Sequence, residues 1–546
     1  MLRGRTYDDV YRNFRWEIPE YYNIGVDVCD KWAGDKRRLA LIYIDPQGNE
    51  QKYTFRSLRD ISNQLANTLK AHGIERTDRV GILLSQRPET LISHIAVYKL
   101  GAVAVQLLTI FGPEAVEYRL ADSQAKAVIT DRDNLSKIHE IRERLPHLEL
   151  MMVVEGGREG AGMDYWESIA RADRQFTPVR TRPDDPALII YTSGTTGQPK
   201  GTFHGHRLLL GILPGFEFYH NFFPQKGDLM WTPLDWGYIG GSYDALFPTL
   251  HHGYPVLAYR PRKFDPEEAF HVMATYGVRN LMAVPTVLRM MMHAVKHPRE
   301  RFDLRLRSIT AGGETMGEEL CHWTRAHLGV DINEQYGQTE CDLVVGYCSQ
   351  IMEIVPGAIG RAVPGHTVEV INEGGQVAGP DELGEIAVKA PDPVMFLEYW
   401  NNPRATREKF IGDWMRTGDY GRKDKDGNFW FSGRQDDIIE SGGYRIGPGE
   451  VEDCLMKHPA VAMVGVIGVS DPVRGEIVKA FILPRAGVTA DTALEQSIQD
   501  HVKERLEAHA YPRQVAFVDE MPRTKTGKIL RNKLRNIHEK EYKLKK

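Results

Sequence analysis

The chain has 546 residues, of which 42% are hydrophobic and 26% charged, and its formal net charge at pH 7 is −5. A chain of this length is too long to fold around one hydrophobic core, so we expect two or more domains. The composition is that of an ordinary soluble protein. The near balance of 69 basic and 74 acidic residues argues against nucleic-acid binding, and the lack of an 18-residue apolar run argues against a membrane span.

The cysteines and the N-terminal residues indicate the cellular compartment in which the protein is expected. The first ten residues contain no apolar segment of the kind that directs secretion, and the five cysteines are odd in number and scattered. This pattern is typical of reduced thiols, so we expect a cytoplasmic protein without a disulfide framework. Cys341 and Cys348 lack the close spacing of a zinc site and are interpreted as structural.

Helical and strand patterns alternate along much of the first half of the chain. Apolar residues recur at helical spacing in 55–71 and 90–100, and short apolar runs typical of buried strands occupy 79–84 and 102–105. The alternation resumes over 255–284. Strands that alternate with helices in this way predict parallel βαβ units.

The pattern changes from 355 to 435, where short alternating runs are separated by glycines and favour a smaller β subdomain. A boundary near Gly433 precedes about 110 residues with two helical and two strand patterns, enough for a small α+β domain. The predicted fold class is α/β. A large N-terminal domain, residues 1–434, would contain βαβ subdomains plus a β subdomain, and a small, mobile α+β C-terminal domain would span residues 435–546.

Residues 191–201 read Tyr-Thr-Ser-Gly-Thr-Thr-Gly-Gln-Pro-Lys-Gly and directly follow a short apolar run. Glycines let backbone N–H groups surround phosphate oxygens, while hydroxyls add donors and a lysine adds positive charge. A Walker P-loop does not fit, because its second glycine would fall on Pro199 or on Thr202, depending on the starting glycine. The loop therefore predicts another way of holding a nucleotide triphosphate, with a plain glycine- and threonine-rich surface loop as the alternative.

Further motifs follow in order: 311–315 (AGGET), 334–340 (EQYGQTE), 414–419 (WMRTGD), 441–448 (SGGYRIGP) and 522–531 (PRTKTGKILR). Together with the glycine-rich loop, they resemble the adenylate-forming superfamily, which contains acyl- and aryl-CoA synthetases, firefly luciferase and the adenylation domains of peptide synthetases. The resemblance runs from about residue 40 to about residue 535 and rests on several motifs in one order. Within the superfamily the chain is most similar to the medium-chain acyl-CoA synthetases.

The resemblance implies a site for ATP and Mg²⁺. Lys528, Thr339 and Glu340 would be catalytic, with Lys528 bridging the substrate carboxylate and the α-phosphate and Glu340 binding the metal, since Mg²⁺ prefers carboxylate oxygen. Asp419 would orient the ribose with Arg434 as its partner. The full implied ATP site is Thr192, Ser193, Gly194, Thr195, Thr196, Gly197, Gln198, Pro199, Lys200, Gly313, Glu314, Thr315, Glu334, Gln335, Tyr336, Gly337, Gln338, Thr339, Asp419, Arg434, Arg445 and Lys528.

The resemblance also implies that coenzyme A meets the small domain. Its site would comprise Gly442, Gly443, Tyr444, Arg474 and Lys503. Because this segment and Lys528 are needed at one active site in different steps, the small domain would rotate about a hinge at Asp436.

The acyl pocket is predicted from two segments. Acetyl-CoA synthetases typically carry a tryptophan where this chain has Gly337, and the missing indole should leave room for an acid longer than acetate. The implied lining is Trp236, Gly237, Tyr238, Gly240, Gly241, Gly337 and Cys341. Trp236 and Cys341 depart from the common pattern, which favours a short- to medium-chain, branched or aryl acid. His204 and His206 are interpreted as packing or pocket residues.

The predicted function is an AMP-forming acyl-CoA synthetase that joins a carboxylic acid to coenzyme A at the expense of ATP. Two alternatives stay open: an adenylating enzyme that loads a carrier-protein thiol, and a non-catalytic nucleotide sensor. We also expect Lys528 to be a target for a lysine acetyltransferase, because acetylation would remove its charge. The sequence leaves the preferred acid and the oligomeric state open, a homodimer included.

Overall fold

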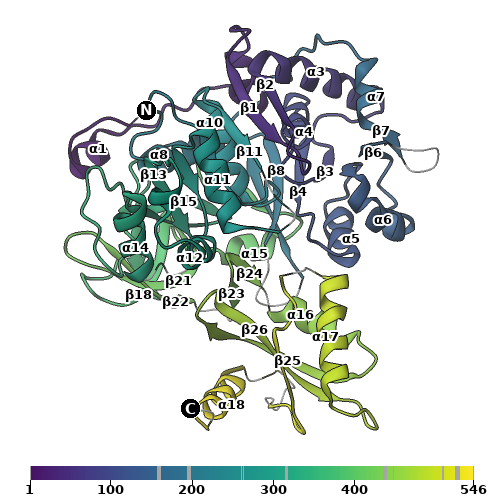
Figure 1. The fold of residues 1–546 in the computed structure, drawn as a ribbon, viewed down its shortest axis with the longest axis vertical. Coiled ribbons are helices and arrows are strands. Elements are labelled where there is room, and N and C mark those ends of the chain that lie inside the picture. The colour runs from purple at the N-terminus through teal and green to yellow at the C-terminus, as the bar shows by residue number, and fades with distance from the viewer. Residues whose placement is uncertain are drawn as a thin grey trace.

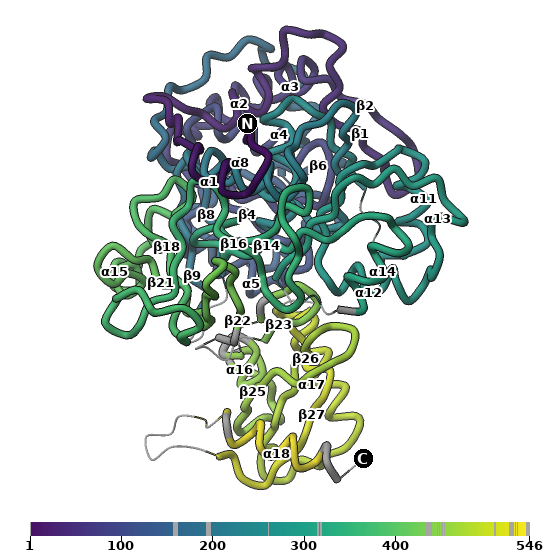
Figure 2. Tube along the Cα trace, turned by 90° about the vertical axis from the view of Figure 1, so that its left-hand side faces the viewer, coloured from purple at the N-terminus to yellow at the C-terminus, as the bar shows by residue number. Residues whose placement is uncertain are grey.

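The computed structural model describes residues 2–544 except 157–161, 193–197, 260, 262, 314–315, 317, 435–438, 447, 507–508, 523–528 and 530. The structure has a large N-terminal domain and a small C-terminal domain, which projects from one end of the large domain (Figure 1). The same two bodies are separate in the view turned by 90° (Figure 2). The predicted fold class, α/β with a large N-terminal and a small C-terminal domain, is therefore confirmed.

The first sheet of the large domain has eight strands in the order β19-β9-β8-β4-β3-β5-β6-β7. From β8 to β7 every neighbouring pair is parallel, which confirms the predicted βαβ units. Its strands are β3 (Arg79–Leu83), β4 (Val103–Leu107), β5 (Ala127–Asp131), β6 (Leu150–Val154), β7 (Met163–Asp164), β8 (Pro186–Thr192), β9 (Lys200–Gly205) and β19 (Glu398–Tyr399). Its connecting helices are α4 (Pro88–Lys99), α5 (Pro113–Asp122), α6 (Arg132–Ile141) and α7 (Tyr165–Ala170).

The second sheet has nine strands in the order β16-β15-β14-β13-β12-β10-β11-β1-β2. Its strands are β1 (Leu39–Ile44), β2 (Glu50–Thr54), β10 (Met230–Trp231), β11 (Val256–Ala258), β12 (Asn280–Met282), β13 (Ser308–Gly312), β14 (Ile332–Gln338), β15 (Cys341–Gly346) and β16 (Arg361–Ala362). The helices associated with it are α8 (Arg207–Tyr219), α9 (Ile239–Gly241), α10 (Phe247–His251), α11 (Pro266–Tyr276), α12 (Pro285–Ala294), α13 (Pro298–Arg301) and α14 (Glu318–Trp323).

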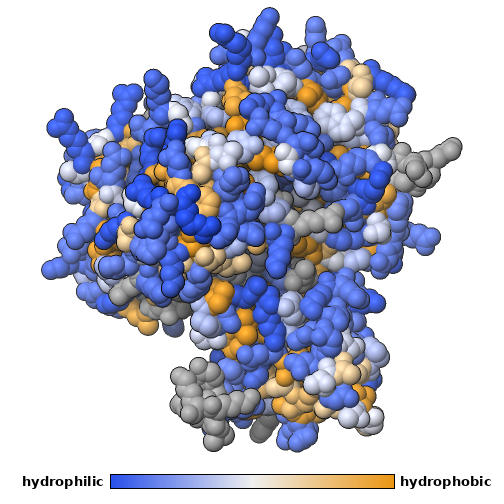
Figure 3. Space-filling model, in the orientation of Figure 1, coloured by the Kyte–Doolittle hydropathy of each residue, from blue (hydrophilic) through white to orange (hydrophobic). Residues whose placement is uncertain are grey.

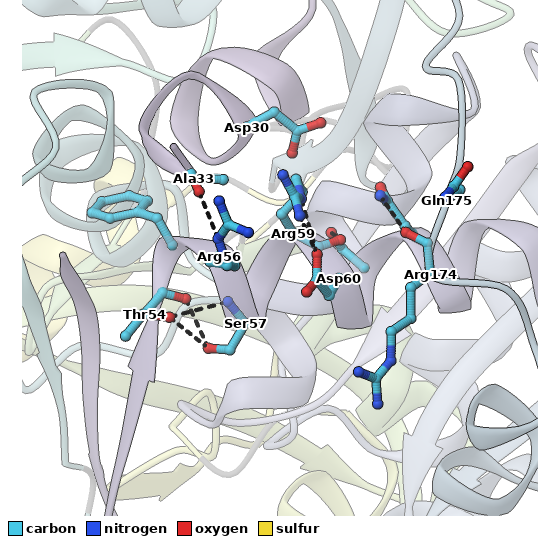
Figure 4. Close-up of polar contacts among 12 residues, drawn as sticks. Asp30, Ala33, Thr54, Arg56, Ser57, Arg59, Asp60, Arg174 and Gln175 are labelled. Atoms are coloured by element: carbon cyan, nitrogen blue, oxygen red, sulfur yellow. Dashed lines mark hydrogen bonds and ion pairs between the residues drawn. The ribbon is translucent and has the colours of Figure 1, made fainter. Parts of the chain in front are cut away.

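Helix α3 (Phe55–Ala71) shows how local sequence sets an element boundary. Thr54 is the N-cap, and its hydroxyl accepts a hydrogen bond from the backbone N–H of Ser57, as such caps do. Two short helices, α1 (Tyr7–Asn13) and α2 (Ile24–Val28), and the 3-10 helix η1 (Asp30–Trp32) precede α3. The guanidinium of Arg56 donates to the carbonyl of Ala33, which ties the first turn of α3 to the end of η1 (Figure 4).

The β subdomain and the C-terminal domain complete the fold. The β subdomain contains β17 (Val368–Ile371), β18 (Gly384–Lys389), β20 (Phe410–Ile411), β21 (Trp414–Lys423), β22 (Phe429–Arg434) and α15 (Pro403–Glu408). The C-terminal domain contains β23 (Ile439–Ser441), β24 (Tyr444–Ile446), β25 (Val461–Asp471), β26 (Gly475–Pro484), β27 (Gln514–Phe517), α16 (Pro448–Met456), α17 (Thr492–Arg505) and α18 (Arg531–Leu544). Helix α18 lies at the end of this domain that is far from the large domain (Figures 1 and 2).

The two domains share an apolar cluster. It contains Phe111 and Val116 of the large domain together with Leu455 and Leu506 of the small one. Two ion pairs lie beside it, from Glu114 of α5 to Lys457 at 2.9 Å and to Arg505 at 3.2 Å. The space-filling view shows a mostly hydrophilic surface with small, scattered hydrophobic areas (Figure 3). Among the described residues, no helix is both long and apolar enough to cross a membrane.

Candidate active site

A cavity of about 340 Å³ lies where the two large sheets, the β subdomain and the small domain meet. Its walls include Thr192 and Lys200 from β8 and β9, Gly337 and Glu340 from the β14–β15 region, and Tyr444 from β24 of the small domain. Its volume lies in the range of small-molecule binding pockets. Segments that the sequence analysis assigned to ATP, to the acid and to coenzyme A therefore line one space.

The glycine-rich loop connects two strands that pair antiparallel. Thr192 at the end of β8 lies opposite Lys200 at the start of β9, so the two ends of the loop are neighbours. Ser193, Gly194, Thr195, Thr196 and Gly197 lie outside the described residues. The carbonyl of Pro199 accepts a hydrogen bond of 2.9 Å from Tyr118, and Gln198 and Pro199 line a second, separate pocket beside α5.

Glu340 is a buried carboxylate in the wall of the cavity. Its Oε1 accepts a hydrogen bond from the hydroxyl of Tyr399, and the Lys200 ammonium lies 5.3 Å from the centre of the Tyr399 ring. Thr339 lines the same wall. Within the described parts of the chain, no group of three or more His, Cys, Asp or Glu side chains could hold a metal ion. A metal here would need oxygen ligands that a bound phosphate supplies, with Glu340 as the protein carboxylate.

Asp419 is held by two side chains of the EQYGQTE segment. The hydroxyl of Tyr336 donates to its Oδ2 at 2.8 Å, and Gln338 Nε2 donates to the same atom at 3.2 Å. Strand pairing places Asp419 of β21 directly opposite Arg434 of β22, although the Arg434 side chain lies outside the description. Buried, prepositioned acceptors of this kind suit the hydroxyls of a sugar.

The AGGET segment of the implied ATP site, residues 311–315, is placed in part. Gly312 and Gly313 line the cavity, and Gly313 has a φ of +84°, a backbone conformation that favours glycine. Glu314 and Thr315 lie outside the described residues. Burial raises the pKa of Glu334 to about 8.

Gly337 has a steric role that its sequence context does not show. The pairing of β14 with β15 shifts register between Tyr336 and Gln338. A Cβ atom on Gly337 would lie 2.4 Å from the backbone nitrogen of Leu343 and 3.0 Å from the carbonyl carbon of Asp342. Glycine is therefore required by the close approach of β15, in addition to any room it leaves for substrate.

The acyl wall differs from the expected set. Gly237 and Tyr238 line the cavity, but Trp236 and Cys341 are fully buried and are not among its lining residues. Gly240 and Gly241 are not among the lining residues either. A Cβ on Gly240 would lie 2.9 Å from the Tyr238 ring, and a Cβ on Gly241 would lie 2.2 Å from the carbonyl oxygen of Asp235. The aromatic side chain that faces the cavity from this segment is that of Tyr238.

Three polar side chains in the wall were not predicted from the sequence. Gln106 of β4, Asp244 of the π-helical turn η3 (Ser242–Leu246) and Asp342 of β15 all line the cavity, and each is at most 6% exposed. Burial and the neighbouring carboxyl of Asp342 raise the pKa of Asp244 well above its usual value. The available sequence signal was an acidic residue inside each of two otherwise apolar segments.

The small domain presents a glycine turn and an aromatic pair. Gly442 and Gly443 have φ values of +60° and +79° at the β23–β24 turn, and a Cβ on Gly443 would lie 2.7 Å from the Val284 side chain. The Tyr444 ring stacks on His509 with centroids 3.7 Å apart, and both residues line the cavity. The turn thus packs closely on the large domain beside the cavity.

Basic side chains extend away from this turn. The backbone carbonyl of Arg474 accepts a hydrogen bond from the N–H of Gly442. Burial, together with the positive charge of Arg474, lowers the pKa of Arg513. Lys503 and Arg513 both lie over the Tyr511 ring, at 4.4 and 4.6 Å. Arg474 and Lys503 were predicted from the sequence, whereas Arg513 and His509 were not. Asp436, Lys528 and the Arg445 side chain lie outside the description.

The two histidines after the glycine-rich loop are buried in the large domain. Burial lowers the pKa of His204 and of His206 to about 3, so both are neutral near pH 7. His206 Nδ1 accepts a hydrogen bond from the backbone of Ile24.

Comparison with known proteins identifies the family. The model of the AMP-binding enzyme family matches residues 29–400, and that of the AMP-binding enzyme C-terminal domain matches residues 450–528. The chain belongs to the AMP-binding enzyme family and is an AMP-forming acyl-CoA synthetase, an acid–thiol ligase. The predicted resemblance is confirmed.

Relatives cover nearly the whole chain. The acyl-coenzyme A synthetase ACSM3 of Rattus norvegicus is 33% identical and the acetyl-coenzyme A synthetase of Bacillus subtilis is 34% identical, and each alignment covers 97% of this chain. The alignments cover 93% and 95% of those two proteins. The crystal structure of a Brucella canis acyl-CoA synthetase matches with a TM-score of 0.74 at 33% identity, covering 99% of this chain and all of the other.

Proposed function

We propose that this acyl-CoA synthetase works through an acyl adenylate and acts on a short- to medium-chain, branched or aryl acid. The substrate carboxylate attacks the α-phosphorus of ATP and pyrophosphate leaves. The thiol of coenzyme A then attacks the acyl carbonyl and AMP leaves. The observation that carries the proposal is the shared cavity, where Thr192, Lys200 and Glu340 of the large domain face the same space as Tyr444 of the small domain.

The phosphate side of the cavity would stabilise the charge that builds on pyrophosphate. Lys200 contributes an ammonium, and Thr192 and Thr339 contribute hydroxyl donors. Donors fixed in place before reaction lower such barriers more than mobile water does. Glu340 would hold Mg²⁺ together with phosphate oxygens, and the metal would neutralise part of the triphosphate charge.

Asp419 would bind the nucleoside part of ATP. Its Oδ2 is fixed by Tyr336 and Gln338, and it is only 1% exposed, so its carboxylate can accept from ribose hydroxyls without first reorganising. Arg434, directly opposite on β22, would supply the partner charge.

We infer that this orientation of the small domain serves the second step. The turn at Gly442 and Gly443 packs beside the cavity, while α18, which begins three residues after Lys528, lies at the remote end of the domain. In the first step Lys528 would bridge the carboxylate and the α-phosphate, and a rotation of the small domain with Asp436 as the hinge would separate the two steps. Arg474 and Lys503, joined by Arg513, would bind the phosphates of coenzyme A.

Pyrophosphate release across acids from acetate to decanoate, with branched and aromatic members, tests the proposal. We expect activity on several C4–C8, branched or aryl acids, and a thioester product only when coenzyme A is present. Equal activity with a carrier-protein thiol in place of coenzyme A would contradict the assignment of coenzyme A as the acyl acceptor. Absence of pyrophosphate release with every acid would contradict adenylation and favour a nucleotide sensor.

A further inference from the structure

We propose that Lys409 is a positioning residue for ATP: its ammonium fixes the amide of Gln338, and that amide fixes the carboxylate of Asp419. Lys409 lies outside all of the motifs, shortly before the WMRTGD segment. The inference rests on the proposed function, because it takes Asp419 to bind the ribose hydroxyls. It deepens that function by naming the cation on which the recognition of those hydroxyls depends.

The backbone of Lys409 is held between α15 and β21. Lys409 is the C-cap of α15, and its N–H donates to carbonyls in the last turn of that helix. Its own carbonyl accepts a 2.8 Å hydrogen bond from the N–H of Arg416 on β21. The next residue, Phe410, begins β20 and lies opposite Met415 of β21. Lys409 is therefore fixed beside β21, from which its side chain reaches Gln338 at the end of β14.

The ammonium of Lys409 sets the orientation of the Gln338 amide. It donates to Gln338 Oε1 at 2.8 Å and to the backbone carbonyl of Thr417 at 3.3 Å. Because an ammonium has donors and no acceptor, only the oxygen of the amide can face it. Gln338 Nε2 then faces the other way, where it donates to the Thr417 carbonyl at 3.0 Å and to Asp419 Oδ2 at 3.2 Å. The amide is thus engaged at both of its ends.

Lys409 also belongs to the wall of the cavity. Lys409, Gln338 and Thr417 all line it, and the lysine is half-buried. Within the described part of the chain, both partners of its ammonium are neutral oxygens, so no carboxylate there balances its charge. A positive charge placed in this way suits a cavity that takes an anionic nucleotide. The position of Lys409 is therefore that of a side chain that serves the bound ligand as well as the fold.

The energetic role of Lys409 follows from these contacts. A hydrogen bond from a charged donor is stronger than a neutral one, and it polarises the amide, which strengthens the bond from Gln338 Nε2 to Asp419. Without the ammonium, the Gln338 oxygen loses the donor that sets its direction. Asp419 would still accept a hydrogen bond from the hydroxyl of Tyr336. Removing Lys409 should therefore weaken the recognition of the ribose without abolishing it.

Discrimination between ATP and its deoxy analogues measures this recognition on the full-length enzyme. ATP–pyrophosphate exchange is followed with ATP, 2′-deoxy-ATP and 3′-deoxy-ATP, and the readout is the ratio of kcat/KM for ATP to that for each analogue. Lys409→Met should lower at least one ratio by about 5-fold or more, through a higher KM for ATP, because Asp419 then binds the hydroxyl less well. Unchanged ratios for both analogues in Lys409→Met would overturn the inference.

A double-mutant cycle shows whether Lys409 acts through Gln338. Gln338→Leu should lower the same ratio, and adding Lys409→Met to it should have little further effect, because members of one hydrogen-bond network are not additive. Effects that multiply would show that Lys409 acts apart from Gln338 and would overturn the inference.

Arg407→Met is the matched control for the loss of a positive charge. It removes an exposed cation of the same helix, α15, and should leave the ratio unchanged. The ratio is measured within one preparation, so loss of folded protein cancels. A fall as large as that in Lys409→Met would assign the effect to net charge and overturn the inference.

Asp419→Ala in the same assay separates this inference from the proposed function. The expected result is a fall of the ratio in both variants, with the larger fall in Asp419→Ala. A fall in Asp419→Ala alone would overturn the inference and leave Asp419 as the group that binds the ribose. If Asp419→Ala kept the ratio of the unaltered enzyme, the proposed ribose role of Asp419 would be wrong, and the inference about Lys409 would fall with it.

Discussion

The hydroxyl of Tyr336 on β14 donates a 2.8 Å hydrogen bond to Oδ2 of Asp419 on β21. This bond joins the second large sheet to the β subdomain, two bodies that are separated by about 80 residues of chain. Gln338 donates to the same oxygen, so Asp419 is fixed in position. A carboxylate held in this way can act on a nucleoside without the entropic cost of ordering it first.

Replacing Asp419 should therefore weaken ATP binding more than replacing the residue that positions it. Hydrogen bonds to a charged group are worth about 1.5–3 kcal/mol, so Asp419→Ala should raise the KM for ATP by about 10- to 100-fold. Tyr336→Phe should cause a smaller rise. The measurement is ATP–pyrophosphate exchange, with Asp426→Asn, an exposed carboxyl between β21 and β22, as the control. Equal effects of Asp419→Ala and Asp426→Asn would show that Asp419 does not contribute to ATP binding.

Lys528→Ala should separate the two half-reactions. Removing an ammonium that bridges two anions should slow acyl-adenylate formation by about 10²- to 10³-fold. Thioester formation from a supplied acyl adenylate should change little, because that step uses the Gly442–Tyr444 face. Lys525→Ala changes a neighbouring lysine of the same motif and should have a much smaller effect on adenylation. Comparable adenylation rates in the Lys528 variant and the unaltered enzyme would contradict the proposed role of Lys528 in adenylation.

Glu114 should favour the observed domain arrangement. It pairs with Lys457 and Arg505 of the small domain, and each partly exposed pair contributes about 0.2–1 kcal/mol. Glu114→Gln should thus slow the thioester step by about 2- to 10-fold, with little effect on adenylation. Glu117→Gln is the matched control, since Glu117 pairs with Arg144 inside the large domain. Single-turnover rates for each step are the measurement, and slower adenylation with an unaltered thioester step would contradict the expectation.

The sequence predicted the chain's architecture because the periodicities that form βαβ units are local. The helical pattern at 55–71 matches α3 (Phe55–Ala71), for example. The motifs likewise predicted which segments meet, since Thr192, Glu340 and Tyr444 line one cavity. Both kinds of prediction depend on residues that are close in sequence.

Which side chains line the predicted acyl part of the cavity could not be predicted from local sequence. Trp236 was expected to line the acyl pocket, but Trp236 is fully buried and Tyr238 lines the cavity. Gln106, Asp244 and Asp342 come from three distant elements, and no local pattern shows that they converge. Which way a side chain points at the end of a strand depends on tertiary packing.

Gly337→Ala tests whether that glycine serves the pocket or the strand pairing. The added Cβ would meet the backbone of Leu343 at 2.4 Å, so β15 must shift. We expect activity on every acid in a panel to fall by a similar factor of about 10 or more, with no change in the preferred chain length. A selective gain on acetate would instead show that the residue controls pocket length alone. Thermal unfolding distinguishes a local shift from loss of the fold.

The buried ion pair of Lys99 and Asp30 should matter for stability alone. The Lys99 ammonium is fully buried, lies 2.6 Å from Oδ1 of Asp30 and also donates to Ser62 and Asn63. Asp30, shown in Figure 4, lies just after α2, so the pair fastens the N-terminal segment to α4. Asp30→Asn leaves the buried ammonium without its counter-charge, which costs about 3–5 kcal/mol in unfolding free energy.

Urea unfolding of the large domain is the measurement for this pair, with kcat/KM recorded on the fraction that stays folded. Glu408→Gln provides the control, since it breaks a fully exposed ion pair with Arg404 and should leave the unfolding midpoint unchanged. Lys99→Met together with Asp30→Asn should recover part of the lost stability, because it removes the uncompensated charge. A double variant less stable than Asp30→Asn alone would show that Lys99 contributes through Ser62 and Asn63 and that its charge is tolerated without Asp30.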